Sequence, residues 1–593
     1  MPVSAVLTLA ILTGAAAVLI WGRWPPEVVA LAATLLLVLG GVLDVPAAMA
    51  GFGSPALAAI AAVYVIGAGL ERAGVASALA RGILRATGNH EVRLILLFCG
   101  AAGLLSGVMN SVGAMAVLLP AAVAAARQAG ISPSRLLLPL ALGTRLGGNL
   151  TLISGPSNLL ASQLLSDAGH RPLGLFELLP LGTAFLVTGV AYLALVGRRW
   201  LPDRGPSPGE EARLADVYRL AERLHALRIS PASPLVGRTL GDSDLGRRMG
   251  LTVLAIVRGS RRIAAPSRDE RLEAGDILVV AGRLDDPSQT DALRAAGLEV
   301  LDDLPEGALD GADAQLAELV LAPRSALEGR TVREVGFRER YGLTVVAVWQ
   351  EGRPRRSGLA DRPLRVGDAL LVQGRRDRIA QLRRDPDFLV LGSQRADVRP
   401  DRAPWALASL AVLAVAATAG LPIVVATWLA AALIVLSGCL SADDLLQAVD
   451  WRVVVFTGAL LPVGTALQAT GAARALAGAA LGVAGGGALA ALATVVVVSV
   501  ILNQVMPSVA ATAVLVPVAL QVAGALALSP HALAMAVIAG TGTTVTPLGN
   551  PVNLMVMGPG GYRMADYLRV GLPLAAVLTV VSLAVIPLAW PLR

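Results

Sequence analysis

Lysine is absent from this chain of 593 residues, and charged residues of both signs make up only 15% of it. Soluble globular proteins carry about a quarter charged residues. Hydrophobic residues account for 55% of the sequence, and the mean hydropathy is +0.68. These values exclude a disordered chain and indicate that most of the protein folds in a membrane. The only cysteines, Cys99 and Cys439, lie in apolar runs, which excludes a disulfide scaffold and favours buried thiols.

All 49 basic residues are arginines, and 35 of them lie between Arg198 and Arg402. Aspartates and glutamates are scattered among them, so this stretch predicts a solvated surface of mixed charge between two apolar halves. The net charge of +7 therefore does not indicate nucleic acid as a partner. No basic region precedes the first apolar run, 4–22, and we interpret this run as a first membrane helix rather than a cleavable signal peptide.

Ten apolar runs approach the length of about 20 residues that a helix needs to cross a bilayer. Two more, 93–126 and 487–525, are predicted to be re-entrant hairpins. The predicted spans are 4–22, 26–43, 54–70, 135–155 and 177–197 in the first half, and 404–421, 423–440, 451–469, 531–557 and 567–590 in the second. The lipid bilayer is thus an expected partner, and we expect a multi-pass protein of the inner (plasma) membrane.

The two apolar halves align with each other at a constant offset of 397 residues, which indicates an internal duplication. Pro120 meets Pro517, and Gly143-Thr144 meets Gly540-Thr541. If residues 201–402 are cytoplasmic, most arginines near the spans fall inside, and the odd number of crossings per half makes the repeats inverted. The predicted fold class is membrane all-α: an inverted repeat of five transmembrane helices plus one re-entrant hairpin each, with two small α+β cytoplasmic domains inserted between the repeats.

The insert is also a duplication, because 229–285 aligns with 321–377 at an offset of 92. Short β-branched runs predict strands, and 234–248 predicts a helix. The repeated pattern, Ser-Pro-Leu-Val-Gly-Arg-Thr-Leu followed by Gly-Leu-Thr-Val and Ala-Gly-Asp, resembles the C-terminal TrkA-C domain of potassium-conductance regulators. The resemblance implies a homodimer and a small regulatory ligand of the nucleotide class. A purely structural dimerisation platform is the alternative.

These patterns divide the chain into membrane repeats, insert domains and linkers. The predicted boundaries are 1–200 for the first transmembrane repeat, 201–228 for a linker, 229–290 for the first TrkA-C-like domain, 291–320 for a linker, 321–385 for the second TrkA-C-like domain, 386–402 for a linker, and 403–593 for the second transmembrane repeat.

Polar residues and glycines interrupt the apolar runs at four places, two in each half. They are 109–113 and 143–149 in the first half, and 506–509 and 540–544 in the second. Broken helices inside a membrane offer backbone groups and helix ends to a ligand. One break alone is typical of a packing kink, but four breaks in symmetric positions favour a binding site.

The stretches 110–120, 147–158 and 547–562 resemble the divalent anion:sodium symporters of the ion-transporter superfamily. In that family each hairpin tip carries a Ser-Asn-Thr triplet that coordinates substrate and helps to form a sodium site. The matching positions are Asn110-Ser111-Val112 and Pro507-Ser508-Val509, so both copies lose the threonine hydroxyl and the second also loses the amide.

The resemblance and the breaks together give the candidate site. The candidate substrate-binding residues are Asn110, Ser111, Val112, Gly113, Arg145, Asn158, Pro507, Ser508, Val509 and Asn553, and the candidate sodium ligands are Ser508, Thr541, Thr543 and Asn550.

Arg145 stands near the middle of its predicted span, where a charge costs at least about 2.5 kcal/mol. A guanidinium beside hairpin amides suits a tetrahedral or planar dianion. We expect Arg145 to lie beside Asn110 and Ser111, where it would take the place of the first half's sodium ion. Pairing with backbone carbonyls, or extension of the side chain to the membrane interface, is the alternative.

The sequence predicts a secondary active transporter of a small, divalent anion of the sulfate or dicarboxylate class, working by elevator-type alternating access. Sodium is the candidate coupling ion, and no other cofactor is predicted. No enzyme motif and no metal-ligand spacing among the histidines is found. Two alternatives remain: a regulated potassium or cation channel or uptake protein, for which a selectivity filter is missing, and a membrane sensor that does not transport.

Overall fold

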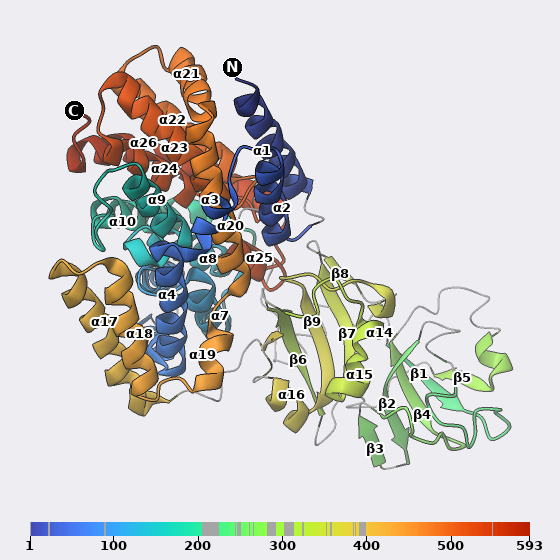
Figure 1. Cartoon of the computed structure of the whole chain (residues 1–593). Helices are drawn as coiled ribbons and strands as arrows, with labels where there is room; N and C mark the ends of the chain where they lie inside the picture. Colours follow the sequence, from blue (N-terminus) through green and yellow to red (C-terminus); the bar gives the residue numbers. More distant parts are fainter. Residues whose placement is uncertain are drawn as a thin grey trace.

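The computed structural model consists of a large body of packed helices and an insert with two β-sheets, and both chain termini lie at the end of the helical body away from the sheets (Figure 1). The structure describes residues 2–21, 24–87, 90–203, 224–243, 245, 251–259, 261–264, 266–281, 292–301, 314–322, 325–350, 353–355, 359–382, 385, 387–390, 399–547 and 550–593.

The helices before the insert are short where glycine and proline interrupt the apolar runs. They are α1 (Val3–Trp21), α2 (Pro26–Leu39), α3 (Val45–Ala50), η1 (Gly51–Gly53), α4 (Pro55–Arg72), α5 (Val75–Thr87), α6 (Glu91–Ser106), α7 (Ser111–Gln128), η2 (Pro133–Arg135), α8 (Leu137–Gly147), η3 (Leu152–Ser154), α9 (Pro156–Asp167), α10 (Leu179–Leu195) and η4 (Gly197–Arg199).

The helices after the insert repeat this arrangement. They are η7 (Pro400–Arg402), α17 (Ala403–Thr418), α18 (Ile423–Leu436), α19 (Ala442–Ala448), α20 (Trp451–Ala469), α21 (Ala472–Ala484), α22 (Ala488–Asn503), α23 (Ser508–Leu526), α24 (Pro530–Gly542), α25 (Pro551–Met557) and α26 (Met564–Ala589). The first residues of α2 and α18, of α5 and α21, of α6 and α22, and of α7 and α23 are each 397 residues apart. The duplication is therefore present in the helix boundaries as well as in the sequence.

Six stretches among the described residues are long and apolar enough to cross a membrane, judged by length and composition. They are Val3–Trp21, Val45–Arg72, Leu179–Arg199, Trp451–Ala469, Ser508–Leu526 and Met564–Ala589, and shorter apolar helices are Pro26–Leu39, Ser111–Ala126, Ile423–Leu436 and Ala488–Asn503. The chain is thus a mostly helical membrane protein with several apolar spans. The stretch Ser508–Leu526 is one arm of a predicted hairpin, and the re-entrant course of that hairpin stays a prediction.

Two of the predicted spans are interrupted helices. In 135–155, α8 ends at Gly147 before α9 begins at Pro156, and in 531–557, α24 ends at Gly542 before α25 begins at Pro551. Proline is favoured at the first position of a helix, because its missing N–H group would have no partner there. The predicted hairpins are adjacent helix pairs: α6 packs on α7 and α22 packs on α23, with tips at residues 107–110 and 504–507.

The insert holds two antiparallel sheets of the same topology. The first contains β1 (Leu224–Ile229), β2 (Thr252–Arg258), β3 (Arg261–Ala264), β4 (Ile277–Ala281) and β5 (Leu298–Leu301) in the order β3-β2-β4-β1-β5. The second contains β6 (Ala314–Leu321), β7 (Leu343–Gln350), β8 (Arg353–Arg355), β9 (Ala369–Arg375) and β10 (Phe388–Val390) in the order β10-β6-β9-β7-β8. Each sheet has a register shift at the same place, between Val253 and Ala255 and between Val345 and Ala347.

The sheets extend beyond the predicted domain boundaries. The strands β1 and β6 begin before 229 and 321, and the strands β5 and β10 lie wholly after 290 and 385. The sequence did not predict these four strands, because each of them adjoins a charged stretch. The strands β1 and β6 are recognised only in the structure, where they pair with β4 and β9. Large parts of the predicted linkers lie outside the described residues.

The helix predicted at 234–248 was wrong for residues 234–243. Residues 231–243 form turns and an isolated bridge, Leu245 is helical, and residues 244 and 246–250 lie outside the described residues. Gly237 has a φ of +82°, which a right-handed helix does not accommodate. The equivalent stretch of the second domain forms two short helices, α14 (Val332–Val335) and α15 (Phe337–Tyr341), separated by Gly336 at a φ of +59°.

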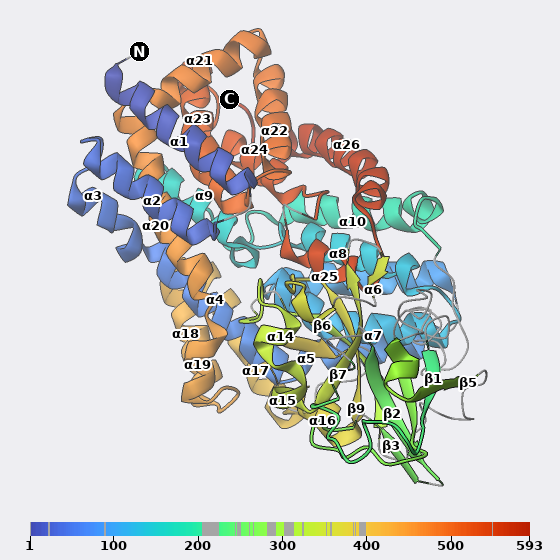
Figure 2. The same ribbon diagram turned by 90° about the vertical axis from the view of Figure 1, so that its right-hand side faces the viewer.

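The second sheet packs directly against the helical body. Val320, Ala322, Ala369 and Leu389 belong to the same buried hydrophobic core as the membrane helices. In Figure 2, α25 lies directly above the sheet that contains β6 and β9. The second insert domain is therefore joined to the membrane part by an apolar interface and not only through the linkers.

A turn of the second insert domain makes the closest contact with α25. Gly367 has a φ of +85°, and a Cβ atom placed on it would lie 2.1 Å from the carbonyl oxygen of Leu554. Gly558, just after α25, faces the same turn, because its Cβ would lie 2.3 Å from the carbonyl oxygen of Gly367. Only glycine at both positions permits this approach of two backbones. The equivalent turn of the first domain has Gly275 with the same φ of +85°, and no atom of a described residue lies within 4 Å of its Cβ position.

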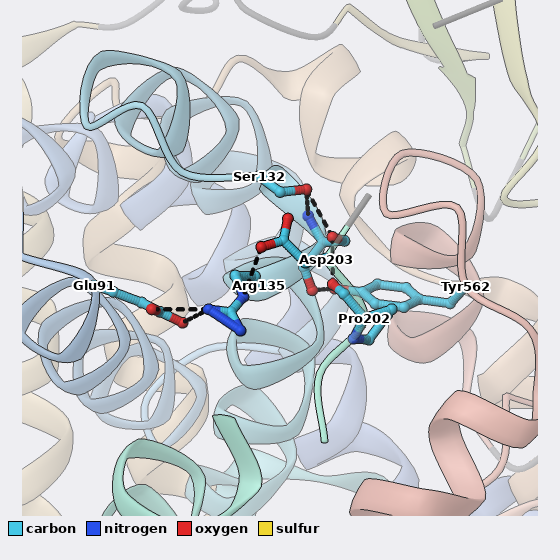
Figure 3. Close-up of polar contacts among 7 residues, drawn as sticks. Glu91, Ser132, Arg135, Pro202, Asp203 and Tyr562 are labelled. Atoms are coloured by element: carbon cyan, nitrogen blue, oxygen red, sulfur yellow. Dashed lines mark hydrogen bonds and ion pairs between the residues drawn. The ribbon is translucent and has the colours of Figure 1, made fainter. Parts of the chain in front are cut away.

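A polar junction anchors the start of the insert (Figure 3). The Ser134 hydroxyl donates a hydrogen bond of 2.7 Å to the carbonyl oxygen of Pro202. Arg135 pairs with Asp203 (Nε to Oδ2, 3.6 Å) and donates from Nη1 to both carboxylate oxygens of Glu91 at 3.1 Å. The junction therefore links the first residue of α6, the residues just before α8 and the chain that leads into the insert.

Three more hydrogen bonds hold the surroundings of this junction and the end of the insert. Tyr562 lies on the segment between α25 and α26 (Figure 3). Its hydroxyl donates to the carbonyl oxygen of Ser134 at 2.5 Å and accepts from the N–H of Leu138 at 2.8 Å. On the far side of the insert, the N–H of Arg399 donates to the carbonyl oxygen of Arg72 at 2.8 Å. The insert thus begins beside α8 and ends beside α4.

Alanine at position 367 is expected to weaken the interface between the insert and α25. Gly367→Ala and Gly275→Ala share the cost of a left-handed backbone, about 1–2 kcal/mol each, but only Gly367→Ala drives a methyl group into Leu554. Gly367→Ala should therefore lower the thermal unfolding temperature more than Gly275→Ala and speed tryptic cleavage of the arginine-rich insert. Equal effects of the two variants would show that the contact with α25 contributes nothing.

Candidate functional site

The first hairpin tip is joined to the break between α8 and α9. The Ser111 hydroxyl lies 2.6 Å from that of Ser106 and donates to the carbonyl oxygen of Thr144 at 3.5 Å. The Thr151 hydroxyl donates to the carbonyl oxygen of Gly107 at the tip. Backbone groups freed by a broken helix need partners in an apolar environment, and the hairpin tip supplies some of them.

The second hairpin tip is joined to the break between α24 and α25 chiefly through Gln504. Its Nε2 donates to the carbonyl oxygens of Thr543 and Val500, each at 2.9 Å. Its Oε1 accepts from the N–H groups of Val545 at 2.9 Å and of Thr546 at 3.2 Å. A single side chain thus satisfies four backbone groups around the tip and the break.

The two halves share equivalent hydrogen bonds at these positions. The Thr546 hydroxyl donates to the carbonyl oxygen of Gln504 at 2.9 Å, as Thr151 does to Gly107. The Asn553 amide donates to the carbonyl oxygen of Thr546 at 3.1 Å, and the Asn158 amide donates to that of Thr151 at 3.4 Å. One asparagine therefore holds the break in each half. Both side chains are buried: Asn553 is 0% exposed and Asn158 is 3% exposed.

Arg145 joins the two halves. Its Nη2 donates to the carbonyl oxygen of Thr541 at 3.0 Å and to the Thr544 hydroxyl at 3.1 Å. The Asn503 amide donates to the same Thr544 hydroxyl at 2.6 Å. These bonds from Arg145 run to the end of α24 in the second half, and not to Asn110 or Ser111 as predicted.

The end of α8 carries a second contact to the same turn. A Cβ atom on Gly542 would lie 2.1 Å from Asn149 Nδ2, so the amide lies directly against this glycine. Arg145 Nε and Asn149 Nδ2 are both buried and have no hydrogen-bond partner among the described residues. A small cavity borders Arg145, with a lining of Leu142, Arg145, Leu146, Gly542, Thr543, Thr544, Val545, Gly571, Leu574, Ala575 and Leu578. Unpartnered buried donors fit a bound anion or water.

Two predicted site residues, Asn110 and Asn550, cap helices through their side-chain oxygens. Asn110 Oδ1 accepts from the N–H of Val112 at 3.0 Å, and Asn550 Oδ1 accepts from that of Val552 at 2.9 Å. Each asparagine thereby stabilises the first turn of the helix that follows. Gly113 lies near the end of α4, because a Cβ on it would be 3.7 Å from Glu71 Oε2.

Three of the four predicted sodium ligands, Thr541, Thr543 and Asn550, already have hydrogen-bond partners within the protein. The hydroxyls of Thr541 and Thr543 donate at 2.9 Å to carbonyl oxygens one turn back in α24, those of Val537 and Ala539. The carbonyl oxygens of the same two threonines accept from Arg145 and Gln504. At the second tip, Pro507 and Ser508 are partly buried at the start of α23, and Val509 is buried.

Sequence reasoning missed Asn503, Gln504 and Glu71, and it placed Asn149 and Thr544 in the predicted breaks without naming them as site residues. A signal was present for three of them, since Asn149, Asn503 and Gln504 are amides within or at the end of apolar runs. Amides in apolar runs are costly unless they are hydrogen-bonded, which makes each of them a candidate for a structural or binding role.

With this geometry in place, comparison with known proteins identifies the family. The profile of the citrate transporter family (CitMHS) matches residues 16–540. This chain belongs to that family. The match agrees with the predicted ion-transporter superfamily, and the protein is a multi-pass membrane transporter rather than an enzyme.

Relatives extend over nearly the whole chain. The uncharacterized transporter YfbS of Escherichia coli K12 is 31% identical over 589 residues, 96% of this chain and 96% of that protein. The uncharacterized transporter sll0640 of Synechocystis is 31% identical over 593 residues, 97% of this chain and 95% of that protein. Sodium/sulfate cotransporter 1 of Chlamydomonas reinhardtii is 29% identical over 357 residues, 56% of this chain and 39% of that protein.

Truncation of Gln504 is expected to loosen the second tip. Gln504→Ala removes four hydrogen bonds and leaves partly buried backbone groups without partners, which should cost about 1–3 kcal/mol. The matched control is Gln163→Ala, which removes only an exposed hydrogen bond to Asp167. Thermal unfolding in detergent should show a clear loss for Gln504→Ala and little change for the control. Similar unfolding temperatures would mean that the tip is held by other contacts.

Proposed function

We propose that this protein is a secondary active transporter of a small divalent anion of the sulfate or dicarboxylate class. The observation that carries the proposal is the convergence of the helix breaks on Arg145, whose Nε remains a buried donor without a partner among the described residues. The residues that line the adjacent cavity include no acidic side chain that would neutralise this charge. An unneutralised guanidinium in apolar surroundings attracts an oxyanion strongly.

Two further lines support this substrate class. A guanidinium can offer an oxyanion several N–H groups in a fixed plane, and Asn149 Nδ2 adds a neutral donor on the same end of α8. Some relatives are named sodium/sulfate cotransporters. The predicted substrate residues Asn110, Ser111, Ser508 and their neighbours then belong to the tips that close over the anion, while Asn158 and Asn553 keep the breaks in shape.

Alternating access of the elevator type follows from the duplication. Two halves of the same helix order, with an odd number of predicted crossings each, form an inverted repeat, and such repeats bind substrate where their broken helices meet. In this proposal the hairpins and the interrupted helices move as a unit with the anion. The helices α2, α4, α18 and α20, which pack on one another, form the stationary part.

The insert is proposed to be cytoplasmic and regulatory. The concentration of arginines in 201–402 favours the inner side of the membrane. The resemblance to TrkA-C domains supports a homodimer and a ligand of the nucleotide class. The apolar interface with α25 gives such a ligand a direct physical connection to the interrupted helix.

Uptake into proteoliposomes tests the transport function. Purified protein should accumulate radiolabelled sulfate or a dicarboxylate from a panel of sulfate, succinate, citrate and phosphate, each with and without sodium. Empty liposomes serve as the control, and counterflow of preloaded substrate should be measurable. Anion binding without uptake would favour a sensor instead, and single-channel currents would favour a channel.

Removal of the Arg145 guanidinium tests the substrate site. Arg145→Ala should weaken anion binding by about 1.5–3 kcal/mol, the range for a hydrogen bond to a charged group. Arg145→Lys should restore part of the affinity, since an ammonium supplies charge but not a planar pair of donors. The control Arg171→Ala removes an exposed arginine paired with Glu177 and should bind normally. Unchanged affinity in a folded Arg145→Ala protein would remove Arg145 from the substrate site.

A further inference from the structure

We propose that the Arg145 guanidinium is a built-in cation that takes the place of a coupling sodium ion at the second hairpin. The idea rests on the proposed transport function, and it differs from the expectation drawn from the sequence, which put this replacement at the first hairpin. The position of the two hydrogen bonds from Nη2 decides between the halves.

The end of α24 is a site for positive charge. The last carbonyl groups of a helix have no partner within the helix, and they carry the negative end of its dipole. Thr541 lies in the last turn of α24, and its carbonyl oxygen accepts from Arg145 Nη2 at 3.0 Å. The Thr544 hydroxyl, just past that end, accepts from the same nitrogen at 3.1 Å. Carbonyl and hydroxyl oxygens are the ligands that hard cations select. Here the carbonyl oxygen of Thr541 and the hydroxyl oxygen of Thr544 both accept hydrogen bonds from the Arg145 guanidinium.

The guanidinium also disfavours a sodium ion at the end of α24, both by its charge and by occupying oxygen ligands. A sodium ion on Thr541 O would lie next to the positive charge of Arg145, and two like charges in apolar surroundings repel strongly. The neighbouring carbonyl oxygen, that of Thr543, already accepts from Gln504 at 2.9 Å. The oxygens expected to hold sodium are thus supplied with donors by the protein itself.

The position equivalent to Arg145 does not supply a cation to the first half. The residue equivalent to Arg145 is Gly542, which has no side chain and against which Asn149 packs. The first tip instead has Ser111 and the carbonyl oxygen of Thr144, and Gly113 at that tip lies near the Glu71 carboxylate. An external coupling cation, where one binds, is therefore assigned to the first tip.

The test compares the sodium response of wild type and Arg145→Gln. Glutamine removes the charge but keeps an N–H donor. The midpoint of thermal unfolding is measured in sodium chloride and in choline chloride at equal ionic strength, with no anion of the uptake panel present. Arg145→Gln should gain an additional sodium-dependent rise of about 1–3 °C over wild type, because the vacated site now binds sodium. Guanidinium chloride at low millimolar concentration should replace sodium in this effect.

Two controls separate charge from general damage. Arg145→Lys keeps a cation at the end of α24 and should respond to sodium as wild type does. Arg171→Gln applies the same substitution to the exposed pair with Glu177 and should also match wild type. An identical sodium response in wild type and Arg145→Gln would overturn the proposal.

A measurement on the unaltered protein keeps the proposal testable if Arg145→Gln does not fold. Equilibrium binding of radioactive sodium to wild type should saturate at no more than one ion per chain, and two ions per chain would overturn the proposal. Failure of the transport function is separately visible: a protein that carries no anion in the uptake panel, but gains a sodium response on loss of Arg145, would retain the built-in cation and lose the proposed function.

Discussion

The bonds from Arg145 to the end of α24 are the contact on which the arrangement of this transporter depends. A helix broken inside a membrane leaves carbonyl and N–H groups that lipid cannot satisfy. In this protein the partners come from elsewhere in the chain: Gln504 from the second tip, Thr151 and Thr546 from the breaks themselves, and Arg145 from the opposite half. The need to satisfy these groups brings four distant segments together and also builds the site.

The duplication gives this site near-symmetry, and a few substitutions break it. The threonine and asparagine bonds at the breaks are the same in both halves. Arg145 and Gly542 are equivalent positions with opposite properties, one a cation and the other without a side chain. The pair is complementary, since the missing side chain at Gly542 leaves space for Asn149 beside the turn that Arg145 binds. The cation is therefore present in only one of the two equivalent positions, at Arg145.

The insert adds a second level of duplication with a similar loss of symmetry. Both sheets have the same strand order and the same register shift, and both turns before the central strand have a glycine at a φ of +85°. Only the second turn meets the membrane part, where Gly367 and Gly558 let two backbones approach. The insert is therefore in mechanical contact with α25, the element that follows one of the breaks, and it also begins beside Arg135 and α8.

The sequence by itself determined the membrane character, both duplications, the positions of the helix breaks and the superfamily. Each of these depends on patterns within the sequence: the length of the apolar runs, a constant offset between repeats, and glycine, proline or asparagine inside an apolar run. It did not determine the partner of Arg145, the role of Gln504, the strands β1, β5, β6 and β10, or the contact of Gly367 with α25. These depend on which distant segments become neighbours. An alignment of two halves shows which residues are equivalent, but whether the Arg145 side chain reaches the first tip or the end of α24 is decided by the packing of α8 between them.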